Sequence, residues 1–354
     1  ARGCGMYCLR ITVTIMRYGT EIEDMPSKHC QGLHALAKGT YAWLAPHGSW
    51  GWSNAGLIAD GEESLLVDTL YDLDLTGAML RCMRDAEPRA HNINRLVNTH
   101  ANGDHCHGNE LVTGAEIIAS NASAAEMQEM PPEVMAALKA AAPDMGPVGQ
   151  YFLHCFGQFR FDGIRFTPPT RTFDEELNLL VGDKPVTLLE VGPAHSRGDV
   201  LVHSPQDRVV FTGDILFIEG TPVMWEGPVA NWIRACERIE DMDVDLIVPG
   251  HGPITDKHGV AQVRQYLQYV RDQARSRFDA GMDAFSAAQD IELAEYAAWS
   301  DPERIAVNVD TLYREFAGEQ SATDMLELFT RMAELAGFTV DRGNQGDAPA
   351  DGQD

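Results

Sequence analysis

The sequence has few basic residues and no long apolar run, and each deficit excludes a class of protein. It carries 27 lysine and arginine residues against 53 aspartate and glutamate residues, a formal net charge of -26. Such a surface repels phosphate backbones and anionic membranes, so we expect no nucleic-acid partner. No apolar stretch approaches the roughly 20 residues that a membrane-spanning helix requires. We therefore expect no membrane partner either.

Cysteine is scarce and scattered along the chain. The seven cysteines show no CxxC spacing, so we expect neither a disulfide framework nor a cysteine-based zinc knuckle. No long hydrophobic segment or AxA cleavage site follows the short apolar run at residues 9–15, which argues against a secretory signal peptide. A reducing cytoplasm is the simplest location for such a chain.

What the sequence does contain is an alternation of strand-like and helix-like segments. Residues 40–44, 54–59 and 64–67 show the composition of short strands separated by glycine-rich turns. Residues 71–85 then have the apolar spacing of a helix, and residues 94–98 return to a strand. This order predicts an α/β fold.

A second strand-rich block lies further along the chain. Strands are expected at residues 187–191, 199–203, 208–212 and 245–248, the last preceded by a helix at 229–241. The two blocks resemble each other, which predicts two packed sheets with helices on their outer faces.

The remaining segments suggest how the domains are arranged. The main domain is expected at residues 39–258, after an N-terminal extension and first strand region at 1–38. A helical insertion rich in methionine and aromatic residues is expected at about 119–161, either as a lid or as a cover for the core. Residues 259–340 should form a helical C-terminal extension, and the polar tail at 341–354 should be disordered.

The strongest functional signal is the run HANGDH at residues 100–105, directly after a predicted strand. Histidine and carboxylate side chains at a strand end can converge on one zinc or iron ion. Three further elements follow, namely His195 in GPAHSRGD, Asp214 in FTGDIL and His251 in VPGHGP, each flanked by glycine. A single loop histidine or aspartate is usually a solvated or capping side chain. Four such elements together predict one shared metal site.

The segments NTHANGDHCHGN, GPAHSRGD, FTGDILF and VPGHGP resemble the successive metal-binding motifs of the metallo-β-lactamase superfamily, over roughly residues 39–256. The resemblance implies a four-layer αβ/βα sandwich with a helical C-terminal extension. It also implies a binuclear metal site with six ligands: His100 and His195 for the first ion, Asp104, His105 and His251 for the second, and Asp214 as the bridge.

Asn102 departs from the family pattern HxHxDH, because it stands where the second histidine is expected. An amide oxygen is a harder and weaker ligand for zinc than an imidazole, so we expect a weakened first site and a single ion at rest. One or two Zn²⁺ ions are expected, with iron or manganese as alternatives. His107 would compensate only if the start of the next helix bends; otherwise it should lie on the helix surface.

The resemblance implies a hydrolase in which metal-bound hydroxide attacks a small-molecule substrate and Asp104 orients that hydroxide. Phe217 stands where some related β-lactamases carry a lysine that binds the substrate carboxylate, which argues against antibiotic hydrolysis. The acidic charge argues against a nuclease, and the basic C-terminal cluster of glyoxalase II-like thioesterases is missing from the sequence. An aromatic or uncharged ester, lactone or activated aryl ether remains, with hydrolytic O-demethylation as one specific form.

Three tryptophans are candidates for substrate binding. Trp50, Trp52 and Trp225 lie in or near loops that could shape a pocket mouth and stack on a flat substrate, or they could fill the core. Two other functions stay open: a single-iron oxidoreductase of the persulfide dioxygenase type, and a non-catalytic subunit that binds a partner enzyme. A homo-oligomer is the default expectation, with a hetero-oligomer as the alternative.

Overall fold

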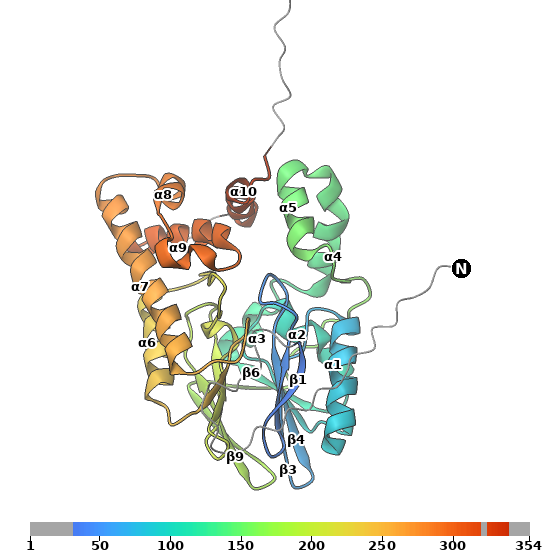
Figure 1. The fold of residues 1–354 in the computed structure, drawn as a ribbon. Coiled ribbons are helices and arrows are strands. Elements are labelled where there is room, and N and C mark those ends of the chain that lie inside the picture. Colours follow the sequence, from blue (N-terminus) through green and yellow to red (C-terminus); the bar gives the residue numbers. More distant parts are fainter. Residues whose placement is uncertain (1–30, 320–323, 340–354) are drawn as a thin grey trace, which may run out of the picture.

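The structure is a computed structural model that describes residues 31–319 and 324–339. The predicted disordered tail and most of the predicted N-terminal extension lie outside the described residues. The described part consists of two sheets packed face to face, with helices on both outer faces and a further group of helices above one end (Figure 1).

The first sheet has seven strands in sequence order. They are β1 (Gly32–Ala37), β2 (Thr40–Leu44), β3 (Ala55–Asp60), β4 (Glu63–Val67), β5 (Arg95–Val97), β6 (Glu116–Ser120) and β7 (Arg171–Phe173). Strands β1 to β4 pair antiparallel, whereas β4 to β7 pair parallel. Since the carboxyl ends of parallel strands meet at one edge, the loops after β4 and β5 begin side by side.

The second sheet has five strands in the order β12-β11-β10-β9-β8. They are β8 (Glu176–Val181), β9 (Lys184–Glu190), β10 (Val200–Ser204), β11 (Val209–Phe211) and β12 (Leu246–Val248). Strand β10 runs antiparallel to β9 and β11, and β12 runs parallel to β11. The loops after β9, β11 and β12 therefore all leave the same edge of this sheet.

Apolar side chains from both sheets form the core between them. Val97 and Ile118 of the first sheet belong to one buried cluster with Val202 and Phe211 of the second. Gly56 on β3 faces the Phe211 ring, which occupies the space that a side chain would need. The sheets can approach closely here because this position has no Cβ atom.

Helices cover the outer face of each sheet. Helix α1 (Leu73–Ala86) begins at Asp72, whose carboxylate accepts a hydrogen bond from the Leu75 amide, and it buries a methionine- and leucine-rich face on the first sheet. Helices α6 (Val229–Asp241) and α7 (Lys257–Asp279) lie on the second sheet (Figure 1). This arrangement confirms the predicted α/β sandwich with a helical C-terminal region.

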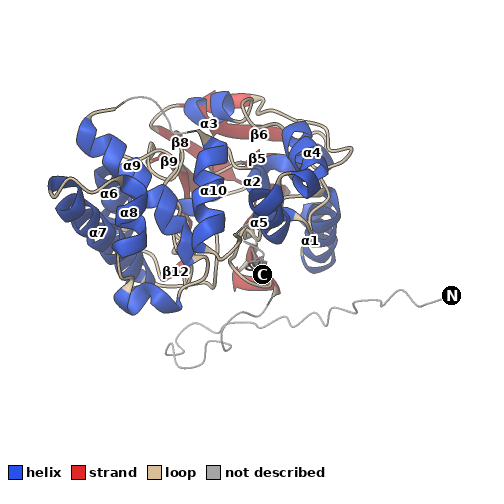
Figure 2. Cartoon of the chain, turned by 90° about the horizontal axis from the view of Figure 1, so that it is seen from above, coloured by secondary structure: helices blue, strands red, loops and turns tan. Residues whose placement is uncertain are grey.

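The remaining helices gather above the edge where the loops after β5, β9, β11 and β12 emerge. They are the short α2 (Gly103–Cys106) and α3 (Asn121–Glu126), then α4 (Pro132–Ala141), α5 (Gly146–Phe156), α8 (Ala284–Asp290), α9 (Ile305–Ala317) and α10 (Met325–Leu335). Seen from above, α10 lies between the α8/α9 pair and the α4/α5 pair, and it packs on both α5 and α9 (Figure 2). We call α4, α5 and α10 the roof.

Two details of the sequence-based prediction need correction. Strands β6, β7 and β8 were not predicted. Strand β6 lies inside the first sheet, whereas β7 and β8 are edge strands with exposed positions and little continuous apolar character. The helical insertion also begins later than residue 119, since Ala119 and Ser120 are buried in β6 and the first helix starts at Asn121. Within the described residues, no helix combines the length and the apolarity needed to cross a membrane.

Candidate metal centre

Six side chains from four separate segments meet at the edge of the sandwich where the two sheets' loops emerge. Each segment follows the carboxyl end of a strand, which explains why residues far apart in the sequence meet in one place. They are His100 after β5, Asp104 and His105 on α2, His195 after β9, Asp214 after β11, and His251 after β12.

Asp214 lies at the centre of this group. Its Oδ1 is 3.1 Å from Nε2 of His105, and its Oδ2 is 3.3 Å from Nε2 of His251. The same Oδ2 is 3.4 Å from Nε2 of His195 and 3.7 Å from Nε2 of His100. One carboxylate thus faces four imidazole nitrogens, as expected of a bridging ligand.

Asp104 supplies a second carboxylate on one side of the centre. Its Oδ2 is 3.4 Å from Nε2 of His251 and 3.8 Å from Nε2 of His105. Two sets of three donor atoms lie within 4.8 Å of one another: His100, His105 and Asp214, and Asp104, His105 and His251.

The anchoring of the imidazoles shows that the residues fit a divalent metal ion. The Nδ1–H of His105 donates to Asp68 (2.9 Å), and that of His195 donates to the carbonyl of Val223 (2.8 Å). The buried Nε2 atoms of His105 and His100, and Oδ1 of Asp214, have no hydrogen-bond partner among the described residues. Buried polar atoms are normally paired, and lone pairs that converge in this way would be satisfied by a bound cation.

Asp68 is a residue that sequence reasoning missed. It follows β4 and is buried, and it accepts hydrogen bonds from the amide (2.7 Å) and hydroxyl (2.7 Å) of Thr99 as well as from His105. The Thr99 hydroxyl, having donated to Asp68, can accept from Nδ1 of His100 (3.1 Å). The only available signal was an aspartate directly after an apolar strand, in SLLVDTL.

Electrostatics keep both carboxylates of the centre ionised. Burial raises the pKa of Asp214, but the neighbouring His251 and His105 outweigh it and hold that pKa well below its usual value. Burial opposes ionisation of Asp104 as well, yet His105 and His251 bring its pKa to about 2. These two carboxylates therefore carry the negative charge that a divalent cation requires.

Asn102 and His107 occupy different surroundings. The Asn102 amide lies at the start of α2, lines the cavity above the centre and points its Nδ2 toward Nε2 of His195 (3.4 Å). The prediction that His107 lies on a helix surface is wrong. Because α2 has only four residues, the chain turns at residue 107 and buries this ring against Tyr71 (5.5 Å) and Phe161 (6.3 Å).

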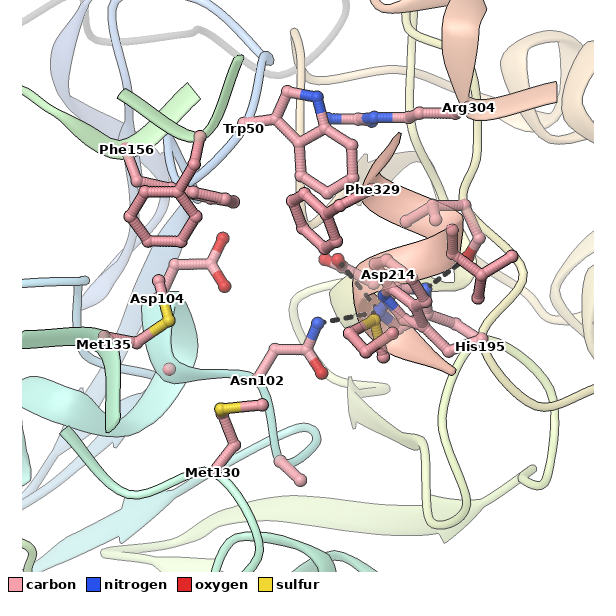
Figure 3. Close-up of a pocket in the computed structure, with 18 of the residues that line it drawn as sticks. Trp50, Asn102, Asp104, Met130, Met135, Phe156, His195, Asp214, Arg304 and Phe329 are labelled. Carbon is pink, nitrogen blue, oxygen red and sulfur yellow. Dashed lines mark hydrogen bonds and ion pairs between the residues drawn. The ribbon is translucent and has the colours of Figure 1, made fainter. Parts of the chain in front are cut away.

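A cavity of about 520 Å³ adjoins the centre and is lined by four of its six side chains, namely Asp104, His195, Asp214 and His251. Figure 3 shows the first three of these with part of the lining. Trp50 and Trp225 line it with their ring centroids 6.2 Å apart, whereas Trp52 is not among its lining residues and packs on Phe159 (5.1 Å). The roof supplies most of the other apolar lining: Met135, Leu138, Val148, Phe152, Phe156, Leu328 and Phe329. Trp50 also belongs to the buried core.

Charged side chains lie at one side of the cavity. Arg197 approaches three glutamates that we call the acidic collar: Glu126 (3.7 Å), Glu129 (2.5 Å) and Glu226 (3.6 Å). Burial raises the pKa of Glu126, and the hydrogen bond from the Arg197 amide opposes this. The group thus has three acidic side chains for one basic side chain.

Comparison with known proteins gives the following matches. A family model described as "Metallo-beta-lactamase superfamily" matches residues 48–251. The acyl-coenzyme A thioesterase MBLAC2 of Homo sapiens is 29% identical over 100 residues, which are 27% of this chain and 34% of the relative. The 2,4-dinitroanisole O-demethylase subunit alpha of Nocardioides sp. (strain JS1661) is 30% identical over 90 residues, 24% of this chain and 26% of the relative. These matches span about a third or less of each relative.

Two solved structures show the same fold at low identity. A metallo-beta-lactamase from Pontibacter korlensis has a TM-score of 0.50 at 17% identity, covering 67% of this chain and 98% of its own. An inverting sec-alkylsulfatase from Pseudomonas sp. has a TM-score of 0.59 at 16% identity, covering 81% of this chain and 50% of its own.

Proposed function

The chain belongs to the metallo-beta-lactamase superfamily, and from this premise we propose that it is a metal-dependent hydrolase of small, uncharged or aromatic molecules. The scissile bond would be an ester, a lactone or an activated aryl ether. The observation that carries the proposal is the convergence of four imidazoles and two carboxylates, of which Asp104, His195, Asp214 and His251 line the floor of an apolar cavity.

The proposed metal ligands are the six residues of the centre, with Zn²⁺ as the expected ion and iron or manganese as alternatives. When bound, such an ion acidifies water and acts as a Lewis acid on an electrophilic group. Asp104 lines the cavity and is ionised, so it can accept a hydrogen bond from the nucleophilic water and orient it. Asp68 and Val223 hold His105 and His195 with Nε2 facing the centre.

The walls of the cavity suit a flat, apolar substrate. Trp50, Trp225, Phe156 and Phe329 offer aromatic surfaces around one space, and aromatic rings stack well on flat ligands. The apolar side chains of the roof would shield a bound substrate from bulk water. We assign no stacking role to Trp52, because its indole packs on Phe159 outside the cavity lining.

The pairing of the charged side chains around the cavity favours an uncharged substrate. Each of the three arginines that line the described part of the cavity already has a carboxylate partner: Arg197 in the acidic collar, Arg304 with Asp301 (3.1 Å), and Arg314 with Asp310 (3.3 Å). A substrate with several negative charges, such as an acyl-coenzyme A, would find no unpaired guanidinium and would meet the collar.

Hydrolytic O-demethylation is the most specific form of the proposal. One relative is named a 2,4-dinitroanisole O-demethylase subunit, and 2,4-dinitroanisole is a flat, uncharged, electron-poor aryl ether of the kind the cavity suits. Because that relative is named as a subunit, a hetero-oligomer is the alternative to the homo-oligomer that we expect by default. Size-exclusion chromatography with light scattering would distinguish these assemblies from a monomer.

Asn102 favours a second candidate, a single-ion oxidoreductase of the persulfide dioxygenase type. The amide leaves the first ion with two imidazole ligands, where the family pattern HxHxDH would supply a third. Metal quantitation on protein purified without chelators separates the two candidates, because one or two zinc ions support hydrolysis and one iron with oxygen consumption supports the alternative. A protein with no bound metal would instead support a non-catalytic partner subunit.

The direct test of the hydrolase is a matched substrate panel on the zinc-loaded protein. We expect turnover of a neutral aryl acetate, a neutral lactone or 2,4-dinitroanisole, and at least tenfold lower kcat/KM for acetyl-coenzyme A than for the aryl acetate. Faster turnover of acetyl-coenzyme A would overturn the substrate class. Absence of turnover across the panel at full zinc loading would overturn the hydrolase itself.

A further inference from the structure

Residues 221–224 form a buried segment between the metal centre and helix α9. The segment follows the loop that carries Asp214, and its member Val223 lines the cavity. It has no strand or helix of its own, so its backbone groups need partners elsewhere. Those partners are mainly side chains of the C-terminal helical region.

Three of the four carbonyls of this segment accept hydrogen bonds from residues in or directly before α9, and one accepts from the metal centre. From the C-terminal side, Arg304 donates to Thr221 O (2.9 Å), Asn308 donates to Pro222 O (2.9 Å) and accepts from Met224 N (2.8 Å), and Thr311 donates to Met224 O (2.7 Å). The one remaining carbonyl, that of Val223, accepts from Nδ1 of His195 (2.8 Å). The backbone of the segment thus links α9 to a proposed metal ligand.

We propose that Asn308 and Thr311 of α9 are positioning residues for His195, acting through the backbone of residues 221–224. The inference rests on the metal site of the proposed function. Val223 O fixes which nitrogen of His195 carries the proton and directs Nε2 toward Asp214, 3.4 Å away. Such outer partners of a metal ligand typically contribute 10- to 100-fold to metal affinity.

Burial makes this link stiff. Asn308 is 1% exposed and Thr311 is 3% exposed, and Asn308 also donates to the hydroxyl of Tyr266 on α7 (3.0 Å). Several buried hydrogen bonds that share one side chain hold their partners in one arrangement. Removing the Asn308 side chain leaves Pro222 O and Met224 N unpaired, so the segment would shift to find new partners and would move Val223 O with it.

The effect should be specific to one ion. His195 is assigned to the first ion, which already has the Asn102 amide in place of an imidazole. The second ion relies on His105, which Asp68 anchors from the opposite sheet without contact with α9. A shift of Val223 O should therefore weaken the His195 ion and leave the other nearly unchanged.

The test measures Co²⁺ binding to the full chain by titration against a competing chelator, with the cobalt absorption spectrum as a second readout. The variant His195→Ala identifies the ion that His195 holds. Asn308→Ala should raise the dissociation constant of that ion about 10- to 100-fold and change its spectrum, while the other constant stays within about threefold. Thr311→Val should give a smaller shift of the same kind, and Thr311→Ser, which keeps the hydroxyl, should restore binding.

Val309→Ala is the matched control for loss of packing in α9. Val309 is fully buried in the core on α9, so its truncation lowers the melting temperature without touching the hydrogen bonds of residues 221–224. If Asn308→Ala does not fold, the comparison of Thr311→Val with Thr311→Ser tests the proposal instead. The positioning role is refuted if Asn308→Ala or Thr311→Val lowers stability as Val309→Ala does but binds both ions as the wild type does. A wild type that binds no Co²⁺ would instead refute the proposed metal site.

Discussion

The floor and the roof of the cavity are built in opposite ways. The floor consists of polar side chains on loops that leave strand ends. Three of its four imidazoles are directed by a hydrogen bond of Nδ1, and the fourth, His251, stacks on Phe217 (4.9 Å). The roof consists of methionine, leucine and phenylalanine side chains on helices α4, α5 and α10. The chemistry and the fit of the substrate therefore depend on different parts of the chain. We expect changes at the floor to affect kcat and changes in the roof to affect KM.

A change at the floor should have the largest effect. Asp104→Ala removes the carboxylate that orients the nucleophile, and we expect kcat to fall about a hundredfold to ten-thousandfold. The far-ultraviolet circular dichroism spectrum should stay unchanged, because Asp104 lies on a short helix at the cavity rather than in a sheet. Asp144→Ala, at an exposed aspartate outside the cavity lining, is the control. A fully active Asp104→Ala protein would contradict the role assigned to this residue.

A change at the first ion site should have the next largest effect. Asn102→His supplies the imidazole that the family pattern has at this position, and we expect the weaker ion to bind roughly tenfold more tightly, a gain of about 1.4 kcal/mol. Isothermal titration of the metal-free protein with Zn²⁺ measures both constants. Unchanged affinity for the weaker ion would show that Asn102 does not limit the first site.

The six floor residues could be predicted from the sequence, whereas the residues that hold them in place could not. The motifs indicated which loops carry the six floor residues, because each motif combines a ligand-type side chain with a flanking glycine. Asp68 and the contacts of Asn308 could not be predicted in this way. Their roles depend on which strands are neighbours and on how α9 folds back over residues 221–224, some 80 positions earlier in the chain.

The roof was harder still to predict. Apolar residues at helical spacing predict helices but do not say whether those helices line a cavity or fill a core, and Phe156 does both. Helix α10 contributes Leu328 and Phe329 to a site more than 70 residues away from the last metal motif. Only the tertiary arrangement brings it there.

A change in the roof should therefore alter substrate binding. Phe329→Ala removes one aromatic wall facing Trp50 (6.2 Å), and we expect KM for an aryl substrate to rise about threefold to tenfold while kcat changes little. Steady-state kinetics with paired aryl and alkyl acetates measure the effect, which should be larger for the aryl ester. Phe316→Ala is the control, since this ring packs on Phe278 away from the cavity lining. A fall in kcat alone would break the division between floor and roof.

The acidic collar should give the smallest effect, because its charges are partly exposed and screened by solvent. Replacing Glu129 and Glu226 together by glutamine leaves Arg197 with Glu126 as its partner in the collar. We expect kcat/KM for an anionic ester to rise about twofold to fivefold at low salt, with no change for a neutral ester of the same size. The gain should vanish at high ionic strength, because salt screens exposed charges. An equal gain for both esters would mean that the glutamates act by their size and not by their charge, and the collar would then belong with the roof as a shape filter.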